Sequence, residues 1–174
     1  MKRDLSLWQL SGFGFTVLSG TLLHFLYDWT GQTTWSALFS GVNESTWEHM
    51  KLLYVPLLLF AVVQFFFFRE YKNFWCVKLT GTICGLILIP VLFYTYNGAV
   101  GPSPDWLNIA IFYISAAAVF YLEWKLFQAE WPKKCLSRLS LYILIGIGIF
   151  FIVFTFWPPR IPLFQDPLNG SYGI

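Results

Sequence analysis

Long apolar runs separated by short polar stretches dominate this sequence of 174 residues. Five of the runs cover about residues 5–27, 50–68, 74–96, 106–123 and 136–157. A helix of roughly 20 mostly apolar residues crosses the hydrocarbon core of a bilayer. We therefore predict an all-α fold, an integral membrane bundle of about five transmembrane helices.

Composition argues against other classes of protein. The chain is 57% hydrophobic, 21% aromatic and only 11% charged, whereas about a quarter of the residues in a soluble domain are charged. The net charge is +2, and no basic face alternates with exposed aromatic side chains. We therefore expect the lipid bilayer as a partner and no nucleic acid.

Two segments lie outside the five spans. Residues 35–42 are apolar but too short to cross a bilayer, so we expect a short re-entrant or interfacial segment between the first and second spans. We assign residues 1–157 to the transmembrane domain and 158–174 to an extracytoplasmic C-terminal tail. Turn signals in the tail predict that it folds back over the outer end, bringing Asp166 or Tyr172 near the histidines; the alternative is a disordered terminus.

Orientation follows from the basic residues, which collect on the cytoplasmic side of membrane proteins. Nine of the eleven lie on the side of the N-terminus: Lys2, Arg3, Arg69, Lys72, Lys78, Lys125, Lys133, Lys134 and Arg138. Lys51 and Arg160 lie opposite with five of the nine acidic residues, so the outer side sums to −3. We therefore place the N-terminus in the cytoplasm. Cys76 and Cys135 fall near the inner side and Cys84 within a span, so we expect no disulfide framework on the oxidising outer side.

Both histidines of the chain fall at the outer ends of the first two spans, so we predict that they face each other. His24 precedes Asp28 by one helical turn on the same helix face. The Asp28 carboxylate could then fix the tautomer of the imidazole, as carboxylates do for metal-binding histidines. The alternative is that His24 is a hydrogen-bonded interfacial histidine at the end of the first span.

The densest polar stretch is VNESTWEHMK, residues 42–51, just before the second span. Ser45 and Glu48 fit a capping box, in which each side chain bonds to the backbone N–H of the other residue. Glu48 can also pair with Lys51, although an exposed pair is worth only about 0.2–1 kcal/mol. These structural roles leave the other polar residues of the stretch without an explanation.

Two histidines and a carboxylate form a known ligand set for zinc, with one position left for water. The end of the third span and the start of the fourth should lie nearby. The candidate metal ligands are His24, His49, Asp28 and Asp105. The candidate catalytic residues are Glu48 and Glu44, and the other polar residues of the site are Asn43, Lys51 and Tyr96.

Three outer segments also carry a resemblance. They are HFLYDW (24–29), VNESTWEHMKLL (42–53) and PLFQDPLNGSYGI (162–174). With them the chain resembles, nearly end to end, a family of small prokaryotic membrane proteins catalogued only as a domain of unknown function. The resemblance implies a multi-pass protein of a prokaryotic plasma membrane whose outer segments belong together. It implies no activity.

Three functions fit these residues. The first is a membrane hydrolase that uses a divalent metal such as zinc and acts on a small molecule or a lipid. The second is a binding or transport component for a small solute or cation, favoured by the negative outer side. The third is a structural subunit. Gly81 and Gly85, four residues apart, would permit close packing within the chain or in a homo-oligomer.

The orientation can be tested with fused reporters. We expect alkaline phosphatase fused after Ile174 to be active in cells, because this enzyme folds only outside the cytoplasm, and green fluorescent protein at the same position to be dark. Fusions after Lys72, between the second and third spans, should give the opposite result. A cytoplasmic signal after Ile174 would contradict the predicted topology.

Overall fold

A computed structural model describes residues 2–174, apart from the side chains of residues 2, 3 and 105. The described chain is helical, and its only β-type pairing is an isolated bridge between Gln165 and Tyr172. The helices are α1 (Lys2–Trp29), α2 (Thr34–Ala37), α3 (Thr46–Phe67), α4 (Phe74–Ala99), α5 (Asp105–Gln128), α6 (Ser137–Phe156) and the 3-10 helix η1 (Pro162–Phe164). Five are long and apolar enough to cross a membrane, which confirms the predicted fold class.

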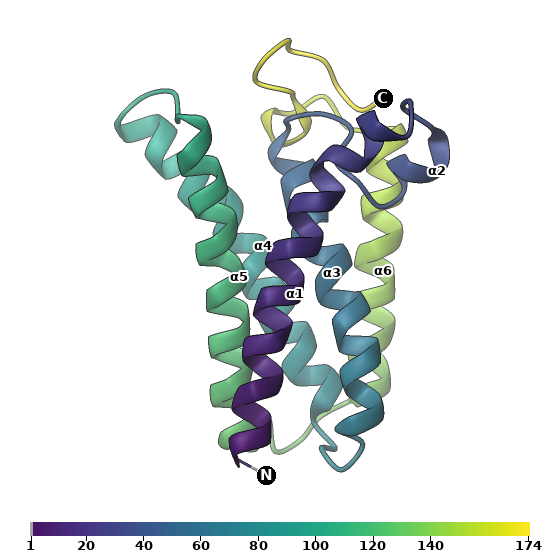
Figure 1. Cartoon of the computed structure of the whole chain (residues 1–174), viewed down its shortest axis with the longest axis vertical. Coiled ribbons are helices and arrows are strands. Elements are labelled where there is room, and N and C mark those ends of the chain that lie inside the picture. The colour runs from purple at the N-terminus through teal and green to yellow at the C-terminus, as the bar shows by residue number, and fades with distance from the viewer. Residues whose placement is uncertain (1) are drawn as a thin grey trace.

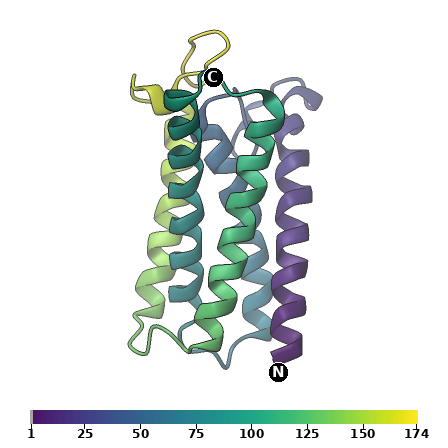
Figure 2. The ribbon, with the colours of Figure 1, turned by 90° about the vertical axis from the view of Figure 1, so that its left-hand side faces the viewer.

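The long helices run side by side along the length of the molecule (Figures 1 and 2). α1 packs against α3 and α5, and α4 packs against α3, α5 and α6. We call the end with the start of α1 and the connections 68–73 and 129–136 the basal end (Figure 1). The apical end holds the connections 30–45 and 100–104 and the C-terminal residues 157–174.

The segment predicted as re-entrant or interfacial forms α2 and the turn after it. Ser36 and Ala37 are buried, whereas Trp35 and Phe39 are 55% and 45% exposed. α2 lies at the apical end (Figure 1), where an interfacial segment would lie. Amphipathic aromatic rings favour the boundary between lipid and water.

The outside of the bundle is apolar, as a bilayer requires. Leu10, Ile87 and Ile149 are each more than half exposed. Water would disfavour so continuous an apolar surface, whereas lipid tails match it. Large aromatic side chains such as Phe74, Phe127 and Phe151 fill the interior between the helices.

One ion pair lies inside the basal half of the bundle, between α4 and α5. The Lys78 Nζ lies 2.5 Å from Oε2 of Glu123, and the two side chains are 3% and 1% exposed. The ammonium also faces the rings of Phe60, Phe74 and Phe120 at 5.6–5.8 Å. The sequence places Lys78 among the basic residues of the cytoplasmic side; the structure buries it within the bundle with Glu123, so that each charge neutralises the other.

Gly81 and Gly85 bring α4 close to α5. A Cβ atom at Gly81 would lie 2.7 Å from Cγ of Glu123, and one at Gly85 would lie 2.4 Å from Cγ2 of Val119. No larger residue fits at either position without displacing its neighbour. Both glycines therefore serve packing within the chain.

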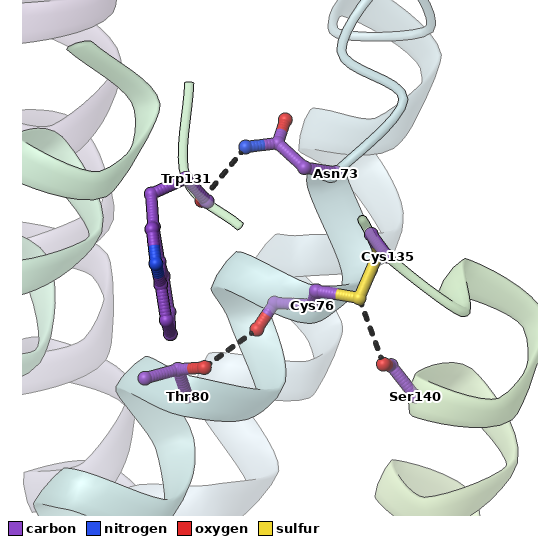
Figure 3. Close-up of a disulfide and its surroundings, with 6 residues drawn as sticks. All are labelled: Asn73, Cys76, Thr80, Trp131, Cys135 and Ser140. Atoms are coloured by element: carbon purple, nitrogen blue, oxygen red, sulfur yellow. Dashed lines mark hydrogen bonds between the residues drawn. A yellow bond between two sulfur atoms is a disulfide. The ribbon is translucent and has the colours of Figure 1, made fainter. Parts of the chain in front are cut away.

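A disulfide joins Cys76, in the first turn of α4, to Cys135, in the connection between α5 and α6 (Figure 3). Their Cα atoms are 6.1 Å apart and 59 residues separate them in sequence. Nearby, Nδ2 of Asn73 donates a hydrogen bond of 2.8 Å to the carbonyl of Trp131 (Figure 3). The disulfide was not predicted from the sequence. Together with the Asn73–Trp131 hydrogen bond, it attaches the connection 129–136 to the start of α4 at two points.

The disulfide predicts the number of free thiols. We expect polyethylene-glycol maleimide to add one unit to protein unfolded in SDS without reduction, because Cys84 is the free cysteine of the described chain. After reduction it should add three, since only thiolates react with maleimide. The Cys84→Ser variant should take up none before reduction. Three adducts without reduction would contradict the disulfide.

Candidate metal centre

Two helices and one connection bring three candidate ligands together at the apical end. His24 lies near the end of α1, His49 lies in the first turn of α3, and Glu44 lies just before α3. Because α1 and α3 are packed neighbours, the imidazole rings meet edge to face with centroids 5.6 Å apart. This contact confirms the prediction that the two histidines face each other.

The carboxylate of Glu44 bridges the two imidazoles. Its Oε1 lies 3.7 Å from Nε2 of His24 and its Oε2 lies 3.5 Å from Nε2 of His49. One potential ligand atom from each residue lies within 4.8 Å of the other two. Tetrahedral zinc with bonds of about 2.0–2.2 Å separates neighbouring ligand atoms by roughly 3.3–3.5 Å. The 3.5 and 3.7 Å distances are at or beyond the limit of direct hydrogen bonds and run to different oxygens of Glu44, so the three side chains lie near the spacing of ligands on one ion without reaching it.

The hydrogen bond of His49 selects its tautomer. Nδ1 of His49 lies 3.0 Å from the backbone carbonyl of Ser45, which accepts but cannot donate a hydrogen bond. Nδ1 therefore carries a proton, and in a neutral ring Nε2 then presents its lone pair toward Glu44. Metal-binding histidines are typically oriented by such a bond to a backbone carbonyl.

A small cavity of about 140 Å³ adjoins this cluster. His24, Asp28 and Glu44 are among its lining residues. Asp28 is exposed, and its Oδ1 accepts a hydrogen bond of 3.3 Å from Nε2 of Gln32. The structure therefore places Asp28 beside the cluster with Gln32 as its partner, whereas the sequence analysis paired Asp28 with His24.

Asn43 holds the residues around Glu44 in place. Its Oδ1 accepts a hydrogen bond of 2.9 Å from the backbone N–H of Ser45, and its Nδ2 donates one of 3.0 Å to the carbonyl of Gly173. Both polar ends of Asn43 are thus engaged. Its role is to fix the backbone that carries Glu44.

The C-terminal tail covers the apical end of α3. Phe164 is 5% exposed and its ring lies 4.7 Å from that of Trp47, while Oδ2 of Asp166 accepts from the backbone N–H of Glu44 at 3.4 Å. These contacts confirm that the tail folds back over this end. Asp166 reaches the backbone beside the cluster, and none of the contacts in the described chain joins Asp166 or Tyr172 to the imidazoles.

The capping box at the start of α3 forms only in part. Ser45 accepts from the backbone N–H of Glu48 at 3.3 Å, as predicted. The Glu48 side chain does not return the bond; it lies 2.6 Å from Nζ of Lys51 and accepts from the Thr155 hydroxyl at 2.8 Å. Glu48 and Lys51 are 2% and 0% exposed, so the pair expected at the surface is buried.

This pair changes the predicted roles of Glu48 and Lys51. Nζ of Lys51 donates to the carbonyl of Ala37 at 2.9 Å and to the hydroxyl of Thr155 at 2.7 Å. With its carboxylate engaged by Lys51 and Thr155, Glu48 is not placed to accept a proton from a substrate. Sequence reasoning missed Thr155, although a lone threonine just before the apical end of α6 is a signal for a buried polar partner.

Two further candidates lie elsewhere. Asp105 begins α5, and its side chain lies outside the described part of the structure. Tyr96 lies in the last turn of α4, and within the described residues no hydrogen bond or ring contact joins it to the cluster. The connection between α4 and α5 stands across the apical end from α2 (Figure 1).

Comparison with known proteins gives one result. A model of a family of unknown function, DUF6512, matches residues 1–174. No curated protein and no solved structure matches the chain. The match confirms the family resemblance seen in the sequence, and it leaves the site to be interpreted from its own residues.

The buried pair predicts a loss of stability when Glu48 is changed. Removing one partner of a buried ion pair typically costs about 3–5 kcal/mol, because the other charge stays buried alone. We expect Glu48→Gln to lower the thermal midpoint in detergent clearly, and Lys51→Met added to it to restore much of the loss. Glu70→Gln, a change at an exposed carboxylate in the connection 68–73, is the matched control and should melt close to wild type. A Glu48→Gln protein as stable as wild type would contradict a structural role for the pair.

Proposed function

We propose that this chain, which belongs to the DUF6512 family of unknown function, is a membrane protein that binds a divalent metal ion through His24, Glu44 and His49. The ligand set of two imidazoles and one carboxylate favours zinc, with other divalent transition metals as its competitors. Nitrogen and carboxylate ligands do not favour soft monovalent ions.

The observation that carries this proposal is the direction of the two imidazoles. Both Nε2 atoms face one carboxylate at 3.5–3.7 Å, and the bond from Nδ1 of His49 to the Ser45 carbonyl turns the Nε2 lone pair toward Glu44. A lone pair and a carboxylate repel each other unless a cation lies between them. A metal ion would supply that cation. The competing explanation is a proton on Nε2, and metal analysis distinguishes the two.

The cavity beside the cluster supports a reaction. Three protein ligands leave a fourth position for water, and a bound divalent ion lowers the pKa of such a water. Asp28 lines the same cavity and is exposed, with one contact to Gln32. We propose that Asp28, rather than Glu48, accepts the proton in hydrolysis of a small molecule or lipid headgroup. Glu44, as a ligand, holds the ion.

A second candidate is cation binding or transport without turnover. The charges assigned to the outer side sum to −3, and the sum is the same when the buried Lys51–Glu48 pair is left out. Asp28 and Glu44 carry part of this charge at exposed or partly exposed positions, whereas Asp166 is buried. The negative charge would attract cations whether or not a reaction follows. The two candidates share the metal site and differ in whether Asp28 matters for turnover.

The protein's placement is part of the proposal. Five spans make it a multi-pass membrane protein, and we propose a prokaryotic plasma membrane with the apical end outside, because nine of eleven basic residues lie toward the basal end. The Cys76–Cys135 disulfide at the basal end is the observation against this orientation, since disulfides are rare in the cytosol.

Metal analysis tests the site directly. We expect protein purified without chelator to contain about one zinc per chain, as a three-ligand site predicts, and expect His24→Ala and His49→Ala to contain little. Zinc at 100 times its dissociation constant should stabilise the wild type by about 2.7 kcal/mol. Asp28→Asn should keep the metal and lose any hydrolysis.

Two outcomes would contradict the proposed metal-dependent hydrolase. Folded protein that contains no metal, and that zinc, manganese and nickel all fail to stabilise, would show that a proton and not a metal lies between the imidazoles and Glu44. Metal bound normally with no effect of Asp28→Asn on uptake or turnover would favour the second candidate.

A further inference from the structure

A groove of about 300 Å³ lies between α1 and α5 in the basal half of the bundle. Gln9, Leu10 and Phe13 line it from α1, and Ala117, Phe120 and Trp124 line it from α5. On each helix these residues recur at three- and four-residue spacing, so each helix contributes one continuous stripe. The volume is at the lower end of the range for small-molecule sites, about 300–1,000 Å³.

The groove opens toward lipid. Leu10 and Tyr121, which lies on the same stripe as Trp124, are 67% and 61% exposed on the outside of the bundle. Near the basal end, Nε1 of Trp124 donates a hydrogen bond of 3.1 Å to the hydroxyl of Ser6 across the two helices. An acyl chain lying along the groove would meet an apolar wall and a polar closure at its basal end.

Gln9 is a polar group without a partner in the wall of this groove. It is 5% exposed, and neither Nε2 nor Oε1 has a hydrogen-bond partner in the described chain. Such an amide is costly inside a membrane, where no water can satisfy it. Both amide atoms are enclosed, so a ligand that offers a carbonyl oxygen would satisfy the amide donor once the side chain turns toward the groove.

Gln9 lies in the basal part of α1, about 10 Å along the helix axis from the start of the helix at Lys2. A lipid whose headgroup lies at the basal end would bring its ester groups toward this part of the helix.

A positive charge stands at the rim of the groove. Nζ of Lys125 lies 4.9 Å from the ring centroid of Trp124 and 5.5 Å from that of Tyr121, both of which line the groove. The side chain is exposed at the basal end. Basic groups between transmembrane helices at the cytoplasmic surface bind anionic lipid headgroups, and the proposed orientation places the basal end at that surface.

We propose that this groove binds one anionic phospholipid. Its acyl chain lies along Leu10, Phe13 and Phe120, the amide of Gln9 donates to an ester carbonyl, and the ammonium of Lys125 contacts the phosphate-bearing headgroup. The lipid satisfies the buried amide and matches the charge at the rim. This site is independent of the metal centre at the opposite end.

Lipid titration of delipidated protein in detergent tests the proposal. Phosphatidylglycerol and phosphatidylcholine with identical acyl chains are compared by native mass spectrometry and by the shift in thermal midpoint. We expect phosphatidylglycerol to bind about fivefold more tightly, as one lysine near the headgroup predicts. Lys125→Gln should remove this preference and Lys125→Arg should retain it. Lys72→Gln, an exposed basal lysine away from the groove, is the matched control and should retain the preference.

The Gln9→Leu variant tests the contribution of the Gln9 amide to lipid binding separately from that of the Lys125 charge. We expect this variant to bind both lipids about fivefold more weakly, because it loses a hydrogen bond to the ester. It should also melt higher than wild type without lipid, because it no longer buries an unsatisfied amide. Equal binding of the two lipids by wild type, or the same loss in Lys72→Gln and Lys125→Gln, would overturn the proposal.

The competing occupant is a second copy of the chain. Tyr121→Cys, placed at the open side of the groove, should stay monomeric when oxidised in native membranes if lipid fills the groove. Efficient disulfide-linked dimers through this position would overturn the lipid proposal in favour of a homo-oligomer.

Discussion

The buried pair of Lys51 and Glu48 joins three separate parts of the apical end. Both residues belong to the first turns of α3; Lys51 also binds the carbonyl of Ala37, and Glu48 the hydroxyl of Thr155 on α6. Two charges removed from water are tolerable only when every donor and acceptor finds a partner. Here those partners are the backbone of the connection 30–45 and the end of α6, so the pair fixes both against α3. The pair therefore also fixes the positions of Glu44, in that connection, and of His49, in the first turn of α3.

The bundle also depends on polar contacts because a bilayer supplies little attraction between helices. Lipid tails are as apolar as leucine, so helices associate through close packing and polar pairs. Gly85 permits the close approach of α4 to α5, and the Lys78–Glu123 pair joins the same two helices nearer the basal end. We infer that the Lys78–Glu123 pair sets the register of α4 against α5, since sliding one helix by a turn would separate the two opposite charges inside the bundle.

Sequence alone predicted the five helices long enough to cross a membrane and the meeting of His24 with His49. The first follows from the length of the apolar runs and the second from the ends of adjacent spans. Sequence reasoning failed where the direction of a side chain determines which residue it contacts. Asp28 shares a helix face with His24, yet Glu44 from the following connection is the residue that reaches both imidazoles. The burial of Lys78 and of Glu48 could not be predicted for a related reason: a charge near the end of an apolar run looks like a surface charge unless its contacts with other segments, here Glu123 for Lys78 and Thr155 for Glu48, are known. The Cys76–Cys135 pairing joins residues 59 apart and needs the packed structure.

The docked tail has a practical consequence for anyone who prepares this protein. The carbonyl of Gly173 accepts from Asn43, and Gly173 has φ +65, with so little room that a Cβ there would lie 2.7 Å from the carbonyl oxygen of Thr155. Ile174, next to it, is 61% exposed. An affinity handle joined directly at this end would start one residue from the backbone that steadies Glu44. A flexible spacer, or a handle at the opposite terminus, would leave the neighbourhood of the histidines undisturbed.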